Sequence, residues 1–117
     1  MNFAQAISAG FSSYVTFSGR AIRSEYWYWA LFTVLGELAA GVIDTILDIN
    51  AVNPLFALAT LLPSIAVGVR RLHDTDRSGW WLLLGLIPLI GTIILIVWFC
   101  YRGTVGSNRF GRDPLGA

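Results

Sequence analysis

The side chains best suited to chemistry are concentrated in residues 70–79, whose sequence is Arg70-Arg71-Leu72-His73-Asp74-Thr75-Asp76-Arg77-Ser78-Gly79. Arg and Asp at such short spacing can pair with each other where the dielectric is low, and the same arginines could grip lipid phosphates. His73 beside Asp74 suggests a general base, although neighbours in sequence rarely face one site. We interpret Arg70, Arg71, His73, Asp74 and Arg77 as a structural lock first, a lipid- or partner-binding group second, and a catalytic site last.

Three acidic residues, Glu37, Asp44 and Asp48, have the spacing of one helical face. Glu37 is expected near the centre of a bilayer, where an ionisable group is a functional candidate because it is costly to bury. It could relay protons or bind a cation. The alternative, which we favour, is a protonated Glu37 hydrogen-bonded to Thr60 or Ser64 of the next span.

The composition indicates a membrane protein without an obvious enzymatic centre. Hydrophobic residues make up 56% of the 117 residues and charged residues only 13%, about half the charge of a typical soluble domain. A net charge of +1 and no basic face argue against nucleic acid as a partner. Cys100 is the single cysteine, so an intramolecular disulfide is excluded. No metal or cofactor motif is present, and we expect no catalytic, cofactor or metal site.

Hydrophobic periodicity predicts one all-α membrane domain over residues 1–117, an integral membrane bundle of three transmembrane helices with an amphipathic interfacial helix at its N-terminus. The interfacial helix is expected within residues 1–19, where apolar residues recur at helical spacing at Phe3, Ile7, Phe11 and Tyr14. A soluble helix packed on a partner is the alternative for this segment. The transmembrane helices are expected at 24–43, 51–69 and 80–101, followed by a polar tail at 102–117.

The third span contains Pro88 and Gly91 near its middle. A helical hairpin in this segment would need about twice as many residues, so the sequence predicts one crossing. The pattern Arg-Ser-x-aromatic-Trp at 23–27 and again at 77–81 opens the first and third spans. Three crossings place both openings on the same side, in agreement with that repeat.

The arginine distribution predicts the orientation. One side is expected to hold the N-terminus and the 70–79 loop, with Arg20, Arg23, Arg70, Arg71 and Arg77. The other side is expected to hold the tail, with Asp44 and Asp48 near Arg102, and with Arg109 and Arg112. The positive-inside rule then predicts a cytoplasmic N-terminus and a tail outside.

Three segments together resemble a known family. They are 19–27 (Gly-Arg-Ala-Ile-Arg-Ser-Glu-Tyr-Trp), 70–81 (Arg-Arg-Leu-His-Asp-Thr, then Arg-Ser-Gly-Trp-Trp) and 103–114 (Gly-Thr-Val-Gly-Ser-Asn-Arg-Phe-Gly, then Asp-Pro). In this order they resemble the bacterial family catalogued as domain of unknown function 805. The motif-type residues are Gly19, Arg20, Arg23, Glu25, Trp27, Trp80, Asn108, Arg109, Phe110 and Gly111. The family usually has Pro where this chain has Arg112 and often Gly where it has Asp76.

The resemblance implies a small multi-pass protein of the bacterial inner membrane, and it implies no reaction. Two function classes follow from the sequence. The first is a non-enzymatic scaffold or accessory subunit that binds membrane lipids and another membrane protein. The second is a small transporter or channel that assembles with copies of itself around Glu37, because three short spans cannot readily enclose a pathway alone.

Overall fold

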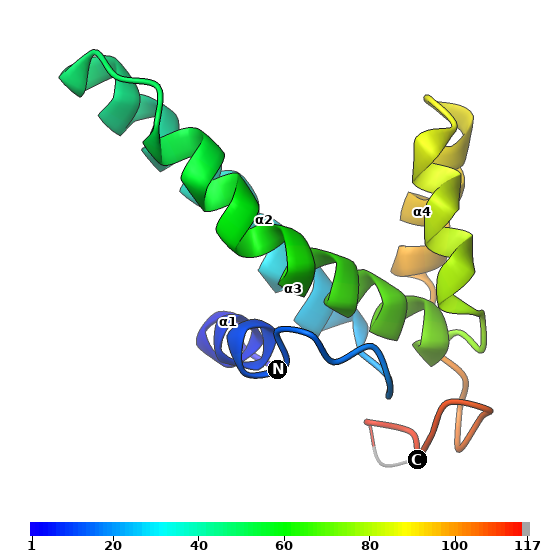
Figure 1. Cartoon of the computed structure of the whole chain (residues 1–117). Helices are drawn as coiled ribbons and strands as arrows, with labels where there is room; N and C mark the ends of the chain where they lie inside the picture. Colours follow the sequence, from blue (N-terminus) through cyan, green and yellow to red (C-terminus); the bar gives the residue numbers. More distant parts are fainter. Residues whose placement is uncertain (116–117) are drawn as a thin grey trace.

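The computed structural model describes residues 1–115, and its regular elements are helical apart from one isolated bridge between Asn108 and Gly111. In chain order they are α1 (Phe3–Ser12), α2 (Arg23–Leu47), α3 (Val52–Asp74), the 3₁₀ helix η1 (Gly79–Leu86) and α4 (Ile90–Cys100). Figure 1 shows two arms that diverge from a common base, with the N-terminus and the tail near that base. We call the α2–α3 pair the long arm and the η1–α4 pair the short arm.

The long arm is an antiparallel pair of apolar helices long enough to cross a membrane. The 25 residues of α2 extend for about 37 Å, more than the roughly 30 Å of a hydrocarbon core. Close packing depends on Gly36, where an added Cβ would lie 2.1 Å from the Phe56 ring. The predicted first two spans are therefore confirmed as helices, with ends several residues beyond 24–43 and 51–69.

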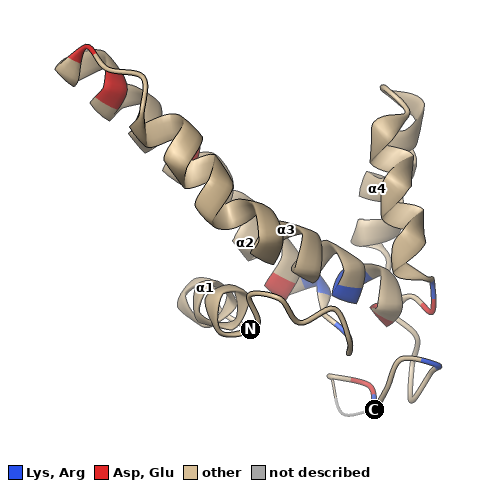
Figure 2. Ribbon diagram, viewed as in Figure 1, with Lys and Arg blue, Asp and Glu red and all other residues tan. Residues whose placement is uncertain are grey.

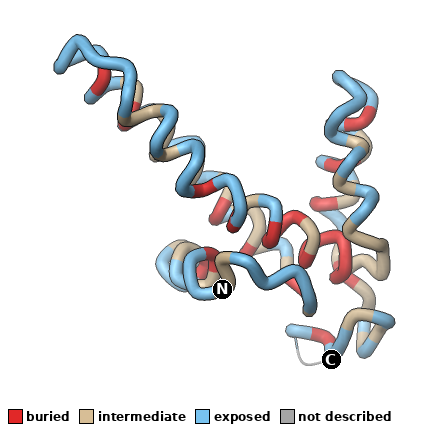
Figure 3. The backbone as a smooth tube through the Cα atoms, viewed as in Figure 1, coloured by how far each residue is buried: buried red, intermediate tan, exposed pale blue. Residues whose placement is uncertain are grey.

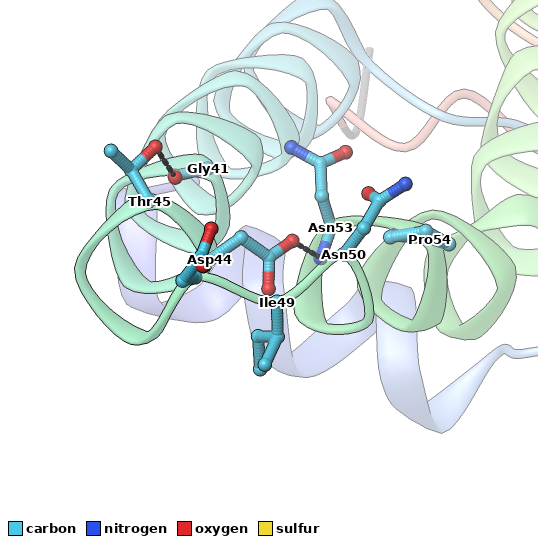
Figure 4. Close-up of a pocket in the computed structure, with 8 residues that line it drawn as sticks. Gly41, Asp44, Thr45, Ile49, Asn50, Asn53 and Pro54 are labelled. Carbon is cyan, nitrogen blue, oxygen red and sulfur yellow. Dashed lines mark hydrogen bonds between the residues drawn. The ribbon is translucent and has the colours of Figure 1, made fainter.

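At the tip of the long arm, Asp44 accepts hydrogen bonds from the backbone N–H groups of Val52 (2.9 Å) and Asn53 (3.0 Å), as Figure 4 shows for the surrounding residues. It thereby satisfies two of the donors that the start of α3 leaves free. Asp48 ends α2 in the left-handed conformation, with φ 52°. The expectation that Asp44 lies near Arg102 is wrong, because Arg102 lies in the tail and pairs there with Asp113.

The single helix predicted over 80–101 is also wrong, because the segment folds into the short arm. Leu89 has φ 66°, and the chain reverses there immediately after Pro88. The two legs then lie side by side, so that the rings of Trp81 and Trp98 come within 5.8 Å. Eight residues of 3₁₀ helix and 11 of α-helix each extend for about 16 Å, half the thickness of a hydrocarbon core.

A short turn makes this reversal possible in so few residues. Pro88 cannot donate a helical hydrogen bond, and an added Cβ at Gly91 would lie 1.7 Å from the carbonyl oxygen of Leu84. The sequence-based count failed because it assumed that both legs of a hairpin must cross the bilayer. A hairpin that enters and leaves on one face needs only half that length.

Helix α1 covers the base of the long arm. Its first turn is closed by a capping box between Asn2 and Gln5. Gly10 lies directly against the Trp29 ring, and Phe11 packs edge-on against the same ring at 5.2 Å. The helix is shorter than the predicted segment 1–19, and its aromatic side chains contact α2.

Buried residues gather where α2, α3 and α4 meet at the base, whereas the arms are mostly exposed along their length (Figure 3). The largest fully buried side chains are Trp29, Arg71, Leu72, Val67, Asp74 and Pro63. Two of these are charged. The most enclosed part of the molecule therefore contains buried charge beside apolar side chains.

Candidate functional site: a buried arginine and carboxylate cluster

Three segments far apart in sequence, 19–27, 70–81 and 103–113, meet at the base of the molecule. Figure 2 shows charged residues grouped there and a second, acidic group toward the tip of the long arm. The segments are joined by ion pairs and by hydrogen bonds to backbone carbonyl groups. We call this arrangement the base cluster and define it by Arg20, Glu25, Arg70, Arg71, Asp74 and Asp113.

Arg20 ties the tail to the end of α3. Its Nε donates to Oδ1 of Asp74 at 2.9 Å, and its terminal nitrogens donate to the carbonyl oxygens of Thr104 (2.6 Å) and Gly106 (2.7 Å). The side chain is 1% exposed. A planar guanidinium with five donors suits such a task because it can serve several acceptors at fixed angles.

Arg71 holds the end of the short arm. Its Nε and Nη2 donate to the carbonyl oxygen of Phe99 at 3.1 and 3.0 Å, and Nη2 also donates to the carbonyl of Tyr101. Nη1 donates to Oδ2 of Asp74 at 2.8 Å and to the carbonyl of Ala21 at 3.3 Å. The carbonyl groups of Phe99 and Tyr101 lie at the C-terminal end of α4, where backbone carbonyls have no partner inside their own helix.

Asp74 is the shared acceptor of Arg20 and Arg71, one on each carboxylate oxygen. Its backbone carbonyl accepts from the N–H of Thr104 at 2.7 Å. An added Cβ at Gly103 would lie 2.0 Å from Oδ2 of Asp74. Only glycine therefore allows the tail to pass this close to the carboxylate.

Glu25 and Arg70 form a second buried pair, at 2.5 Å between Oε2 and Nη1. The pair joins the start of α2 to the end of α3. The Nε and Nη2 atoms of Arg70 are buried and have no partner within residues 1–115. Water molecules enclosed beside the pair would satisfy these donors.

His73 is held by the first and third segments. Its Nδ1 lies 3.0 Å from the carbonyl oxygen of Gly19, and its ring stacks on Phe110 with centroids 3.9 Å apart. The side-chain amide of Asn108 donates to the backbone carbonyl of His73 at 2.9 Å. His73 and Asp74 are not joined to each other by a hydrogen bond among the described residues, so the general-base arrangement is not formed.

The tail closes the cluster through Asp113. Its Oδ2 accepts from Arg102 (3.0 Å) and from the N–H of Gly106 (3.0 Å), and its Oδ1 accepts from the N–H of Leu115 (3.0 Å). The backbone donors of Leu115 and Gly106, together with Arg102, lower the pKa of Asp113 to about 2. The carboxylate is therefore charged at neutral pH.

An exposed pair extends the cluster to the surface. Arg109 donates from Nε to Oδ1 of Asp76 at 3.2 Å, with side chains that are 65% and 42% exposed. The same guanidinium lowers the pKa of Asp76. An exposed pair of this kind contributes little to stability, so the buried part of the cluster carries the energy.

The base cluster joins elements and offers little for catalysis. Asp74 and Asp113 are surrounded by donors, and Glu25 accepts from a buried arginine. Among the described residues, no group of three or more His, Cys, Asp or Glu side chains could hold a metal ion. Carboxylates whose oxygens already accept hydrogen bonds from arginines and backbone N–H groups suit a structural role.

Glu37 lies apart from the base cluster, on the long arm. The predicted partners are engaged elsewhere, because the Thr60 hydroxyl donates to the carbonyl of Phe56 at 2.9 Å and the Ser64 hydroxyl accepts from Nε1 of Trp29 at 3.0 Å. Within residues 1–115, no hydrogen bond reaches the Glu37 carboxyl group, and only its backbone carbonyl accepts, from the Asn53 amide at 3.2 Å. The expected internal hydrogen bond is therefore absent.

A shallow pocket of about 490 Å³ opens beside Glu37 on the outer face of the long arm. It is lined by Glu37, Leu38, Gly41, Val42, Thr45, Ile46 and Asn53. A second pocket, of about 500 Å³, continues to the tip and includes Asp44 and Asp48. The acidic face predicted from the spacing of these residues is thus present, but Asp44 serves as a cap within it.

Charge is strongly segregated along the molecule. Seven of the eight arginines lie in the segments that meet at the base and the eighth, Arg102, directly precedes one of them; four carboxylates, Glu25, Asp74, Asp76 and Asp113, lie there too. The base thus has a formal excess of four positive charges. The remaining three carboxylates lie toward the tip, Glu37 and Asp44 on α2 and Asp48 at its C-cap. The expected placement of the tail opposite the 70–79 loop is wrong, because Arg20 and Asn108 bind the two together.

Sequence reasoning missed several residues of this site. Arg20 and Glu25 were noted only as motif residues, and the roles of Asp113 and Gly103 were not foreseen. One signal was available: three Arg- and Gly-containing segments each adjoin an apolar span, so a fold that brings the ends of the spans together also brings these segments together.

Helical arms with apolar, exposed surfaces and a polar base define a multi-pass helical membrane protein. The family model described as "Protein of unknown function (DUF805)" matches residues 14–112, and the chain belongs to this family.

Curated relatives agree with this assignment. Inner membrane protein YhaI of Escherichia coli strain K12 is 49% identical over 107 residues, which cover 87% of this chain and 88% of the relative. Inner membrane protein YhaH of the same strain is 45% identical over 108 residues, covering 87% and 89%. Uncharacterized protein YiiR is 33% identical over 129 aligned positions, covering 84% and 85%. No solved structure matches. The chain is a multi-pass inner-membrane protein of a family without a known reaction.

Proposed function

We propose that this protein is a non-enzymatic accessory subunit of the inner membrane that docks another membrane protein on the α2 face around Glu37. The observation that carries the proposal is the Glu37 carboxyl group. It lies on the long arm, half-buried, and no hydrogen bond reaches it within the described chain. A polar group left without a partner in hydrocarbon is costly, so a partner from outside the chain would be favoured.

The surface around Glu37 suits a second helix. Gly41, which has no side chain, and the small residue Thr45 line the same pocket as the larger Leu38 and Val42. Small residues let two backbones approach, and hydroxyl or amide groups then bond across the interface. A partner helix with an Asn, Gln, Ser or Thr at the level of Glu37 would satisfy the carboxyl group.

The proposed orientation places the base in the cytoplasm and the tip of the long arm in the periplasm. The arginine distribution supports it, since all eight arginines lie at one end. By the positive-inside rule, that end stays on the cytoplasmic side. In this topology α2 and α3 cross the membrane, the short arm enters only the cytoplasmic leaflet, α1 lies at the interface, and both termini are cytoplasmic.

Photo-crosslinking in native membranes tests the docking face. A photo-reactive amino acid replaces Leu38, which is exposed beside Glu37, and the matched control places it at Ile43, exposed on another face of α2. The expected result is an adduct with a different membrane protein from position 38 and none from position 43. The adduct should persist in Glu37→Gln, which keeps the hydrogen-bonding group, and disappear in Glu37→Leu.

The second function class, an oligomeric transporter or channel, uses the same Glu37 differently. The continuous acidic pockets from Glu37 to Asp48 favour it. An adduct of twice the chain mass, together with a proton or cation flux in reconstituted vesicles that Glu37→Gln abolishes, would replace the accessory-subunit proposal. Equal adducts from both positions would remove the docking face altogether.

A further inference from the structure

An apolar groove of about 520 Å³ runs between the long arm and the short arm. One wall is the α3 stripe Ile65, Val69 and His73, and the other is the start of η1. The two walls meet because Gly79 has no side chain, since an added Cβ would lie 2.7 Å from Val69. The outer rim is formed by Phe17 and Trp80, both exposed. The volume falls within the range of small-molecule pockets.

The groove is polar only at its base end. Its remaining lining residues, Ile65, Val69, Phe17, Trp80, Leu82 and Leu83, are apolar, whereas His73 and Ser78 lie where α3 ends and η1 begins. From Ile65 to His73 the stripe extends for about 12 Å. This is close to the half-thickness, about 15 Å, of a hydrocarbon core. The groove thus matches one leaflet in both length and polarity.

Positive charge lies at the same end. Arg77 directly precedes the lining residue Ser78 but does not itself line the groove, and its guanidinium lies over the Trp98 ring of α4 at 4.2 Å from the centroid. Within residues 1–115, Arg77 forms no ion pair, and the base as a whole has four more positive than negative charges. An anionic group at Ser78 would therefore lie one residue from an arginine that has no carboxylate partner among the described residues, and the Arg77 side chain would turn from Trp98 to reach it.

We propose that the groove binds one anionic phospholipid of the cytoplasmic leaflet, with an acyl chain along Ile65 and Val69 and its phosphate at the Arg77 and Ser78 end. The phosphate would accept hydrogen bonds from the arginine fork and the serine hydroxyl. The site lies on α3 and η1, so it is independent of the docking face around Glu37, whereas its assignment to the cytoplasmic leaflet rests on the proposed orientation.

Native mass spectrometry of the whole chain in mild detergent tests the proposal. The probes are phosphatidylglycerol and phosphatidylcholine with identical acyl chains. Ile65→Phe fills the groove, and Leu58→Phe, an exposed position of the same helix outside the groove, is the matched control. Arg77→Gln removes the charge and leaves the groove.

The parent and Leu58→Phe should each retain one phosphatidylglycerol in preference to phosphatidylcholine. Ile65→Phe should lose the bound lipid, and Arg77→Gln should weaken phosphatidylglycerol about five-fold with little effect on phosphatidylcholine, as expected for one arginine at an anionic headgroup. Equal retention of both lipids by the parent, or an Ile65→Phe variant that binds like the parent, would overturn the proposal. So would a groove that stays lipid-free and is covered by a co-purified protein.

Discussion

Replacement of Arg71 by alanine should destabilise the protein more than any surface change. Arg71 is fully buried and joins the carbonyl groups of Phe99 and Tyr101, at the end of the short arm, to Asp74 on α3. Breaking a buried ion pair typically costs about 3–5 kcal/mol. Asp74 keeps Arg20 as a counter-charge, so the pair itself accounts for the lower end of this range. The freed carbonyl groups add about 1–3 kcal/mol where water cannot reach them.

The total loss of about 4–6 kcal/mol in a chain of this size corresponds to a fall in Tm of roughly 16–24 °C. Thermal unfolding in mild detergent, followed by tryptophan fluorescence, measures it. The control is Arg109→Ala, which breaks the exposed pair with Asp76 and should lower Tm by no more than a few degrees. Arg71→Lys keeps the charge but loses the fork, and should fall between the two.

Asp74→Ala provides a second reading of the same network. It leaves both Arg20 and Arg71 buried without their carboxylate, so it should be at least as damaging as Arg71→Ala. If Arg71→Ala and Asp74→Ala both melt within about 2 °C of the parent, the base cluster does not hold the arms together. The reasoning from burial to stability would then be refuted.

Three further predictions concern the tail and the topology. With the base in the cytoplasm, and in a Cys100→Ser background, an impermeant maleimide added to intact cells should label a single cysteine placed at Asn50 and should not label one placed at Ser107. Labelling at Ser107 would contradict the shared side of tail and base. Because the folded-state pKa of Asp113 is depressed to about 2, its stabilising contacts are fully present above its unfolded pKa near 4 and are lost as pH falls through 2. Protection of residues 104–113 against hydrogen exchange, measured relative to an unstructured peptide at the same pH, should therefore stay high at pH 4.5 and be lost near pH 2. Loss of protection already at pH 4.5 would exclude this carboxylate as the group that holds the tail. Gly103→Ala places a Cβ 2.0 Å from the Asp74 carboxylate and should release the tail. Residues 104–113 should then exchange their amide hydrogens fast at neutral pH while α2 stays protected. A tail that exchanges as in the parent would show that the close approach is not required.

The sequence was sufficient for the membrane class and for the long arm, because an apolar run of about 20 residues has few other uses. It was insufficient for the short arm. Residues 80–101 have the length and hydrophobicity of a span, and the reversal depends on a left-handed Leu89 that no propensity predicts. The wrong placement of the tail followed from this error, because adding or removing one membrane crossing changes the side on which the tail emerges.

The polar site was predictable in composition but not in pairing. The 70–79 segment was correctly identified as the densest polar region, yet its charges pair mainly with Arg20, Glu25 and Arg109, which are distant in sequence. Pairing depends on which ends the helices bring together. The internal bond expected for Glu37 failed because Ser64 and Thr60 already serve Trp29 and the α3 backbone.

The segregation of charge also bears on how the chain enters the membrane. In the proposed orientation only the connection between α2 and α3, residues 48–51, has to be carried across together with the adjoining tip, and this stretch contains no arginine. The carboxylates of Asp44 and Asp48 are the charges that cross. A membrane potential that is negative inside favours their outward movement by about 2.3 kcal/mol per charge for each 100 mV. The two helices of the long arm can therefore insert as one hairpin. The membrane potential favours outward movement of the carboxylates at its tip, and the arginines keep its base on the cytoplasmic side.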